Sequence, residues 1–542
     1  MDNPSDLFRR LEQLNAIGAA LSKERDINRL LETILIAAKT ITHADGGTLY
    51  RMTEDGKALR FEILRTDSLD IAMGGTTGNV INFPNLPLSN DKGEANDSMV
   101  AAYAAIHDKT VNIADAYTEA GFDFSGTRSF DERTGYRSQS FLTVPMKNHE
   151  GEIIGVLQLI NAVDPRSKKV TPFSSADQSL AESLASQAAI ALTNRLLITQ
   201  LEELFEAFIN LINLAIDEKS PYTGGHCQRV PALTMMLAEA ADATREGPLA
   251  SFRMDDRDRY ELKIAGLLHD CGKVTTPVHV VDKATKLQTL FDRIHLIDTR
   301  FEVLKRDAEI NALRRQLALR GPADAGADEP IWQNYLEEVR VLDEEREFLR
   351  KANVGGEAMK EADQQRVRDI GSRHKWRDVD AVETEFLSVD EADNLSIRAG
   401  TLTQKEREII NYHIVATIKM LEQLPWPKHL TKVPEYAGGH HERMDGKGYP
   451  KGLTREQMSL QARMMGIADI FEALTAKDRP YKPGMKLSQA MGIMANFRKN
   501  GHIDPDLFEV FIKQGVYRRY AEAFLDPGQV DDVDEAAILK SA

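Results

Sequence analysis

The sequence predicts a multidomain chain, in which an α+β sandwich is followed by an all-α helical bundle that a helical arm interrupts. At 542 residues the chain is too long for one ordinary hydrophobic core. Strand-like segments are concentrated in the first 198 residues. Beyond about residue 205 the apolar residues recur almost wholly at helical spacing. These observations predict two different fold classes in one chain.

The first block, residues 1–198, opens and closes with helical patterns, over residues 7–41 and 174–216. Between them, five segments are rich in β-branched and aromatic residues: 46–52, 58–64, 110–115, 140–148 and 151–162. Gly151 in "NHEGE" supplies a turn between the last two segments, which predicts a β-hairpin. Helix, antiparallel strands and helix together predict the α+β sandwich.

The closing helical pattern runs for about 40 residues without a breaker, well beyond the usual globular length. We therefore expect residues 185–216 to form a signalling helix that connects the first block to the next domain. We also expect this helix to join two copies of the chain in a homodimer.

The second block, residues 205–525, is predicted to be a helical bundle. Residues 287–398 interrupt it with a charged stretch whose apolar residues keep helical spacing, which favours a helical hairpin or coiled-coil arm. Residues 526–542 are expected to form an acidic tail.

Composition excludes several classes of protein. The net charge of −16, with no offsetting basic stripe, argues against a nucleic-acid binder. No signal peptide is recognisable in residues 1–21, and no apolar run approaches the ~18 residues of a membrane span. Only two cysteines occur, Cys227 and Cys271, which predicts no disulfide framework. We therefore expect a cytoplasmic protein with no membrane partner.

The pair His269–Asp270 is the first candidate for metal chemistry. Adjacent helical residues point about 100° apart, so one ion is hard to share. Two ions solve this problem if His269 holds one and the two oxygens of Asp270 bridge both. Lys273 lies one turn further on, where its ammonium can meet a phosphate oxygen.

Further candidate ligands lie on or beside apolar helical segments, where an unpaired polar group would be costly. They are His226, His413, His440, His441 and Asp469. His295 is an alternative to His413, although its sequence context is less suitable. Mixed imidazole and carboxylate ligands favour Fe, Mn, Zn, Ni or Co over Ca or Mg.

Two motifs carry a family resemblance. "HDCGK" at residues 269–273 and "HHERMDGKGYP" at residues 440–450 resemble the HD-GYP subfamily of the HD metal-dependent phosphohydrolases. The resemblance covers about residues 210–290 and 400–510. It implies hydrolysis of cyclic dinucleotides, above all cyclic di-GMP, to linear pGpG or GMP.

The resemblance also assigns roles to residues. It implies that Asp270 and Lys273 are catalytic, and that the substrate is held by Lys273, Tyr449, Arg479 and Lys482. Its implied metal ligands are His226, His269, Asp270, His413, His440, His441 and Asp469. In the second motif we expect Glu442, Arg443 and Asp445 to brace the loop through internal salt bridges, and Gly446 and Gly448 to permit its shape.

Some members of the family hold a third metal with a glutamate four residues before the first histidine, where this chain has Tyr222. We therefore expect two divalent transition-metal ions, Fe or Mn, with Asp217 and Glu218 as alternative ligands for a third. Two other functions are kept open. One is hydrolysis of cyclic GMP-AMP or another nucleotide, and the other is dinucleotide sensing without catalysis, coupled to a signalling protein partner.

Residues 111–162 are similar to GAF domains of the cyclic-nucleotide phosphodiesterase type. Asn161, Phe173 and Asp177 match members of the Asn-Lys-Phe-Asp-Glu set of that family, whereas Ala162 and Gln178 depart from it. The resemblance implies a sensory domain that takes a small-molecule ligand and regulates the hydrolase. The departures put a cyclic nucleotide in doubt as that ligand.

Overall fold

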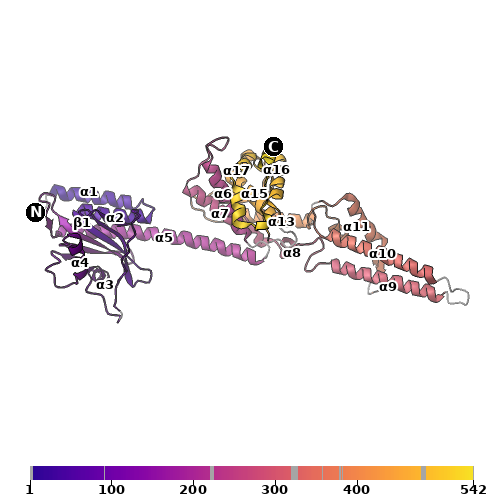
Figure 1. The fold of residues 1–542 in the computed structure, drawn as a ribbon, viewed down its shortest axis with the longest axis horizontal. Coiled ribbons are helices and arrows are strands. Elements are labelled where there is room, and N and C mark those ends of the chain that lie inside the picture. Colours follow the sequence, from indigo (N-terminus) through magenta and orange to yellow (C-terminus); the bar gives the residue numbers. More distant parts are fainter. Residues whose placement is uncertain are drawn as a thin grey trace. The chain divides into compact units, whose positions relative to one another are not determined.

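The computed structural model describes residues 4–90, 92–219, 225–318, 328–356, 358–377, 380, 382–477 and 484–540. The chain divides into two compact units, Met1–Phe205 and Glu206–Ala542. The first contains an antiparallel sheet and the second is almost wholly helical (Figure 1). The predicted fold class is therefore confirmed.

The first unit is built on a sheet with the strand order β3-β2-β1-β7-β6-β5, while β4 pairs with β2 and β8 pairs with β7. Every strand pair is antiparallel. The strands are β1 (Ala44–Met52), β2 (Ala58–Thr66), β3 (Ile71–Gly74), β4 (Leu86–Pro87), β5 (Val111–Ile113), β6 (Phe141–Lys147), β7 (Ile153–Val163) and β8 (Val170–Thr171).

Helices cover both faces of this sheet. On one face α1 (Pro4–Leu21), α2 (Ile27–Thr42) and the first part of α5 (Ser175–Lys219) bury a large apolar cluster against the central strands. On the other face α3 (Val100–His107) packs over β6 and β7, and α4 (Ser125–Thr134) follows it in the chain. Two apolar layers against one sheet form the core of this unit.

All five predicted strands are present, but the helical pattern over residues 7–41 contains two helices rather than one. Asp26 separates the two helices, because its carboxylate accepts the backbone N–H of Arg29 at 2.8 Å and caps the start of α2. Gly151 has φ +86° in the turn between β6 and β7, as the hairpin requires.

The second unit is a bundle of short helices. The helices before the arm are α6 (His226–Ala243), α7 (Asp256–Leu268), η1 (Cys271–Thr275) and α8 (Val278–Val281). Those after it are α13 (Gln404–Glu422), α14 (Val433–Gly438), η2 (Arg455–Gln457), α15 (Leu460–Thr475), α16 (Leu487–Lys499), α17 (Pro505–Lys513), α18 (Val516–Phe524), η3 (Pro527–Gln529) and α19 (Glu535–Lys540).

The charged stretch forms a helical hairpin with a core of its own (Figure 1). Phe301, Leu342, Leu349 and Phe386 are among its buried residues. Its elements are α9 (Ile294–Ala318), α10 (Asp328–Asn353), α11 (Glu361–Arg373), β9 (Lys375–Arg377), β10 (Glu383–Glu385) and α12 (Val389–Leu395).

Cys227 and Cys271 are buried and not bonded to one another. Among the described residues, no helix combines the length and the apolar character that crossing a bilayer requires.

Candidate metal centre

Five elements of the second unit bring the predicted metal ligands together. His226 is the first residue of α6, His269 and Asp270 follow α7, and His413 lies within α13. The adjacent histidines follow α14, and Asp469 lies within α15. Five of the seven ligands are at most 7% exposed: His226, His269, Asp270, His413 and His440. These residues come from distant parts of the sequence, so the fold itself assembles the site.

Asp270 lies at the middle of the cluster. Its Oδ2 is 3.0 Å from His226 Nε2 and 3.3 Å from His269 Nε2. Its Oδ1 is 3.3 Å from His413 Nε2. Asp469 joins the first side, since its Oδ1 is 3.3 Å from His226 Nε2. The two oxygens of Asp270 therefore face two different sets of histidines.

Two groups of three residues are each compact enough to hold a cation. One consists of His226, His269 and Asp270, and the other of His413, His440 and His441. Within each group the ligand atoms lie within 4.8 Å of one another. Asp270 belongs to the first group and its Oδ1 also contacts His413 of the second.

Three of the histidines are oriented by the same kind of local hydrogen bond. The Nδ1 atoms of His269, His413 and His440 contact the carbonyl oxygens three residues earlier in the chain, at 2.7, 2.5 and 2.6 Å. A carbonyl can only accept, so each Nδ1 carries the proton and each Nε2 presents a lone pair to the centre.

His226 begins its helix and lacks such a carbonyl, so a carboxylate replaces it. Its Nδ1 is 2.6 Å from Glu472 Oε2. Arg229 donates to Glu472 Oε1 at 2.9 Å through Nε, and its Nη2 lies 2.8 Å from the same oxygen. Glu472 is 0% exposed. Glu472 and Arg229 were not predicted from the sequence. The available signal was the spacing of Glu472, one helical turn after Asp469.

The electrostatics of the cluster place most ligands in the protonation state that a metal requires. Burial lowers the pKa of His441 to about 4, and burial with His441 and His269 lowers the pKa of His440 well below its ordinary value. Burial opposes ionisation of Asp270, but Lys273, His269 and His226 outweigh it and hold its pKa well below the ordinary value.

His226 differs from the other histidines. Burial alone would lower its pKa, but Glu472, Asp270 and Asp469 together raise it well above the ordinary value. Burial would likewise raise the pKa of Glu472, yet His226 and Arg229 lower it to about 2. His226 therefore sits in a strongly anionic setting that suits a cation.

The contacts between the ligands test whether the site fits metal ions. His413 Nε2 lies 3.2 Å from His441 Nε2 and also faces Asp270 Oδ1. Asp270 Oδ1 and His440 Nε2 are buried and receive no hydrogen bond within the described part of the chain. Lone pairs that face one another in a buried site repel unless a cation lies between them. The donor set therefore fits divalent metal ions.

Lys273 borders the cluster on the side of Asp270. Its Nζ is 2.5 Å from Asp270 Oδ2. Burial would lower the pKa of this ammonium, but Asp270 and Asp469 raise it above the ordinary value. A charged ammonium at this position can bind a phosphate oxygen next to the ligands.

The loop 440–450 forms one side of the site. The ring of Tyr449 stacks on the ring of His441, with centroids 4.9 Å apart and planes 22° apart. Glu442 braces the loop by accepting the backbone N–H groups of Lys451 at 2.7 Å and Leu453 at 2.9 Å. The predicted salt bridge is present between Arg443 and Asp445, at 2.8 Å. Glu442 was also expected to form a salt bridge, but it braces the loop by accepting backbone N–H groups.

The two glycines of this loop are required for different reasons. Gly446 has φ +74°, a conformation that other residues adopt only with strain. At Gly448 a Cβ atom would lie 2.4 Å from Arg443 N and 2.5 Å from Glu442 Cα, so no side chain fits.

Four predicted positions are not part of the cluster as described. Arg479, Lys482 and Tyr222 fall outside the described residues. His295 lies on α9 with 76% of its side chain exposed, and its Nδ1 is 3.9 Å from Asp298 Oδ2.

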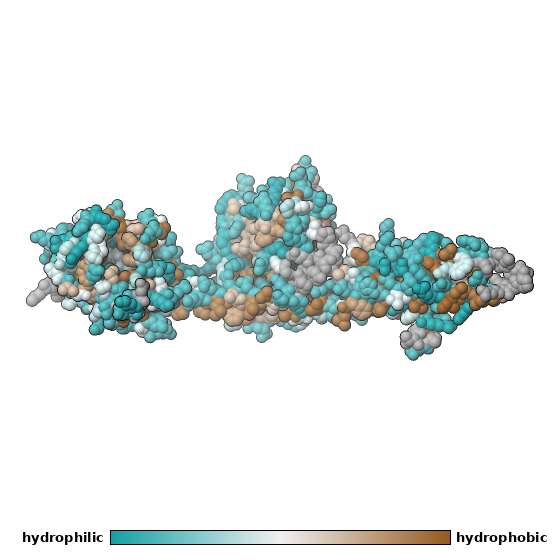
Figure 2. Space-filling view, turned by 60° about the horizontal axis from the view of Figure 1, so that its bottom comes forward, coloured by the Kyte–Doolittle hydropathy of each residue, from teal (hydrophilic) through white to brown (hydrophobic). Residues whose placement is uncertain are grey.

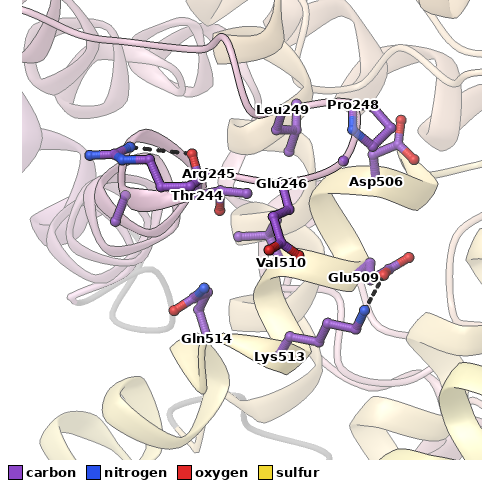
Figure 3. Close-up of a pocket in the computed structure, with 12 residues that line it drawn as sticks. Thr244, Arg245, Glu246, Pro248, Leu249, Asp506, Glu509, Val510, Lys513 and Gln514 are labelled. Carbon is purple, nitrogen blue, oxygen red and sulfur yellow. Dashed lines mark hydrogen bonds and ion pairs between the residues drawn. The ribbon is translucent and has the colours of Figure 1, made fainter.

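A second surface cavity, of about 580 Å³, lies between the loop after α6 and helix α17 (Figure 3). Its two basic side chains have partners within the chain. Lys513 contacts Glu509 at 2.5 Å, and Arg245 donates to the carbonyl of Asp242 at 2.5 Å. None of the predicted site residues lines it.

In the first unit, the residues matched to the Asn-Lys-Phe-Asp-Glu set have structural contacts. Asn161, at φ +57°, accepts the N–H of Gln139 at 2.7 Å and donates to the carbonyl of Arg137 at 2.8 Å. Asp177 accepts from Ser174 N at 2.9 Å and pairs with Arg10. These contacts brace the end of β7 and the start of α5.

Comparison with known proteins assigns both units to families. Residues 26–192 match the sequence model of the GAF domain, and residues 223–331 and 390–507 match two models of the HD domain. The chain is therefore a GAF–HD protein. The two HD matches flank the central part of the arm and belong to the same helical unit.

Several characterised proteins are similar to parts of the chain. A cyclic di-GMP phosphodiesterase of Pseudomonas aeruginosa is 38% identical over 144 residues, which is 26% of this chain and 34% of that protein. The 3'3'-cGAMP-specific phosphodiesterase 1 of Vibrio cholerae is 44% identical over 81 residues, 15% of this chain and 19% of that protein. A cyclic di-GMP phosphodiesterase of Thermotoga maritima is 32% identical over 132 residues, 23% of this chain and 35% of that protein. The chain thus spans little more than a third of these relatives at most.

Proposed function

We propose that the second unit is an HD-GYP phosphodiesterase that hydrolyses cyclic di-GMP to linear pGpG or GMP with two divalent metal ions, Fe or Mn. The observation that carries the proposal is the pair of facing ligand groups shared by Asp270, with Lys273 beside them. The names of the relatives from Pseudomonas and Thermotoga support cyclic di-GMP as the substrate.

The residues of the chain have separate tasks in this reaction. When bound, the metal ions would supply Lewis-acid charge for the phosphate and for water activation. Lys273 is placed to stabilise the equatorial phosphate oxygens or to give a proton to the leaving 3′ oxygen. Tyr449, fixed by its stack on His441, offers an aromatic face to a base. We assign Arg479 and Lys482 to the substrate phosphates from the sequence motif.

A second substrate deserves a direct test, because the relative with the highest identity among those described acts on 3'3'-cGAMP. Cyclic GMP-AMP carries the same two phosphodiester bonds as cyclic di-GMP and differs in one base. The ligand groups and Lys273 act on the phosphate, so they suit both substrates. Only contacts with the bases could make the enzyme prefer one of these two substrates.

Regulation by the GAF domain is supported by helix α5. Leu180, Leu184 and Leu192 near its start belong to the core of the first unit. Near its end, Lys219 Nζ donates to the backbone carbonyls of Lys273 at 3.4 Å and Val274 at 2.5 Å. A ligand that moves α5 in the GAF domain would therefore act on the segment that carries Lys273.

The deciding experiment is hydrolysis by the full chain, purified without oxygen and loaded with Fe or Mn. Chromatography of the products from cyclic di-GMP, 3'3'-cGAMP and mononucleotides would identify substrate and product. We expect Lys273→Met to lower kcat by about 10²–10³ while the chain keeps its metal. Glu261→Gln, a buried change elsewhere in the bundle, should keep the activity. A metal-loaded chain that hydrolyses none of these compounds would instead favour a dinucleotide sensor that signals through a protein partner.

A further inference from the structure

The aspartate that faces both ligand groups stands at the start of a helix. Asp270 is the N-cap residue of η1, and Gly272 is the second residue of that helix. An N-cap aspartate normally accepts the backbone N–H of the second or third helical residue, because no carbonyl of the helix itself can reach these groups. Asp255 and Asp504 cap α7 and α17 of this chain in that way. The ordinary partner of the Asp270 carboxylate would therefore be the N–H of Gly272.

Asp270 does not cap its own helix. Its carboxylate accepts none of the backbone N–H groups at the start of η1, a helix that the structure describes in full. Its oxygens instead face His226, His269 and His413, at 3.0, 3.3 and 3.3 Å. Both oxygens are thus directed at the metal centre, and neither is left for the helix. The N–H of Gly272 needs another acceptor.

Thr417 supplies this acceptor from a different helix. It lies on α13 one turn after His413, and its Oγ1 accepts Gly272 N at 2.9 Å across 145 positions of sequence. Hydrophilic side chains cover most of the face shown in Figure 2, whereas this contact lies inside the bundle: Thr417 is 0% exposed and Gly272 is buried. Water is therefore not at hand to replace a lost acceptor.

The burial links this hydrogen bond to the position of Asp270. A buried N–H group without an acceptor is costly. If Thr417 lost its hydroxyl, the carboxylate of Asp270 is the group placed to restore the bond, and it would have to turn away from the histidines to do so.

We propose that Thr417 is a positioning residue, which caps η1 in place of Asp270 and so leaves both oxygens of Asp270 free to bridge two metal ions. The inference rests on the two-ion centre of the proposed function and is independent of the substrate. Its test therefore needs no hydrolysis.

Metal binding by the full chain is the first measurement. We expect the wild type to bind two Mn²⁺ ions in calorimetric titration. Thr417→Val keeps the shape of the side chain and should bind the ions about 10–100-fold more weakly, because Asp270 then competes for the N–H of Gly272. Thr417→Ser keeps the acceptor and should bind as the wild type does. Thr417→Ala also lacks the hydroxyl, so it should bind weakly and gives the answer if the valine variant does not fold.

Thr234→Val is the matched control. Thr234 lies on α6 of the same unit and is also 0% exposed, but its Oγ1 has no hydrogen-bond partner in the described part of the chain. The same substitution removes a hydroxyl that caps no helix, so the affinity for Mn²⁺ should stay that of the wild type. Equal weakening in both valine variants would indicate a general loss of packing and would overturn the proposal.

Electron paramagnetic resonance at saturating Mn²⁺ reports the bridge itself. Two Mn²⁺ ions that share a carboxylate couple magnetically, and their spectrum differs from that of isolated ions. We expect the spectrum of a coupled pair from the wild type, Thr417→Ser and Thr234→Val, and that of isolated ions from Thr417→Val. A Thr417→Val protein with the affinity and the coupled spectrum of the wild type would overturn the inference. A wild type that binds no pair of ions would refute the two-ion centre, and this inference with it.

Discussion

Glu472 shows how one residue outside the proposed ligand set can influence the candidate metal centre. It is completely buried and contacts Nδ1 of His226 on one side and Arg229 on the other. A carboxylate at this position fixes which imidazole nitrogen faces the metal and makes that nitrogen more basic. The Nδ1 atoms of His269, His413 and His440 contact a backbone carbonyl three residues earlier. Among these four histidines, His226 alone is oriented by a side chain that is distant in the sequence.

We expect Glu472→Gln to weaken metal binding by about 10–100-fold. The amide keeps the shape and an acceptor oxygen, but it loses the charge that both His226 and Arg229 require. Metal retained per chain after dialysis, and calorimetric titration with Mn²⁺, measure the effect without reference to catalysis. Glu261→Gln is the matched control, because Glu261 is also buried but accepts from the backbone N–H of Lys432 at 2.7 Å. Equal affinities in all three proteins would show that Glu472 has no role in metal binding.

Gly272 is a second residue whose role is set by close packing. A Cβ atom here would lie 2.0 Å from the carbonyl oxygen of His413 and 2.5 Å from Thr417 N, both backbone atoms of α13. Neither atom can turn aside as a flexible side chain would. Gly272 therefore allows η1 and α13 to approach closely enough for Asp270 and His413 to meet.

Gly272→Ala should destabilise the helical unit by about 3 kcal/mol and lower its metal content, because α13 must move away and take His413 with it. Urea unfolding of the full chain, followed by metal analysis, measures both effects. Gly492→Ala on α16 is the control, since no atom outside the local backbone of its own helix lies within 4 Å of its Cβ position. That variant should be more stable by about 0.5–1 kcal/mol. A Gly272→Ala protein with normal stability would contradict the packing argument.

At the scale of elements, the segment between α8 and the helical arm contains two buried lysines, of which only one contacts a carboxylate among the described residues. Lys283 and Lys286 are each 2% exposed. Lys283 contacts Glu406 at 2.8 Å and Asn394 at 2.9 Å. Lys286 donates to the carbonyl of Leu395 at 2.9 Å, and no carboxylate is among its contacts in the described chain. Burial lowers the pKa of Lys286 to about 8.

The sign of the pH effect follows from this shift. Lys286 has a pKa of about 8 in the folded chain and 10.5 when unfolded. Between these values the unfolded chain binds more protons, so the free energy of unfolding rises with pH. We expect Lys286→Met to stabilise the arm by about 1–2 kcal/mol at pH 7 and to have no effect near pH 11. Hydrogen exchange of α9–α12 in the full chain measures this difference.

Lys283→Met is the matched control for that prediction. It removes the cation that Glu406 and Asn394 contact and leaves a largely buried carboxylate without its partner. We expect a loss of about 2–4 kcal/mol at pH 7. If both variants changed stability in the same direction, charge pairing would not explain the difference between the two lysines.

The elements also show which features of the fold the sequence could predict. The five strands with three or more residues and clear β-branched or aromatic content were predicted, whereas β4 and β8, two residues each, and the four-residue β3 were not. Such short strands are defined by pairing with β2 or β7 rather than by any local pattern. The break before α2 was missed because the apolar spacing continues across it, although Asp26 carried the capping signal.

The candidate site was predictable to the extent that its residues share a motif. The histidines and aspartates that the structure brings together all belong to the resemblance or to apolar helical segments. Glu472 and Arg229 lie on the same helices as Asp469 and His226 but outside both motifs, and their role depends on a contact that spans 246 positions of sequence between Glu472 and His226. A glutamate on a helix gives no sign in the sequence that tertiary packing will bury it.

At the scale of the whole molecule, the two units have separate cores, and the proposed metal ligands all belong to the second. A ligand that binds only the folded state stabilises the unit that holds it, by about 2.7 kcal/mol at a concentration one hundred times its Kd. Metal binding should therefore raise the melting temperature of the second unit and not that of the first.

We expect calorimetry of the full chain to show two transitions. Mn²⁺ at one hundred times its Kd should raise the melting temperature of the helical unit by about 5 °C and leave that of the GAF unit unchanged. Chelation should reverse the shift. Asp270→Asn should abolish it, because both ligand groups lose the carboxylate that contacts them. If the melting temperature of the GAF unit rose equally, metal binding would be coupled to the first unit. The next variants would then be made in α5, because Lys219 near its end donates to the backbone carbonyl of Lys273.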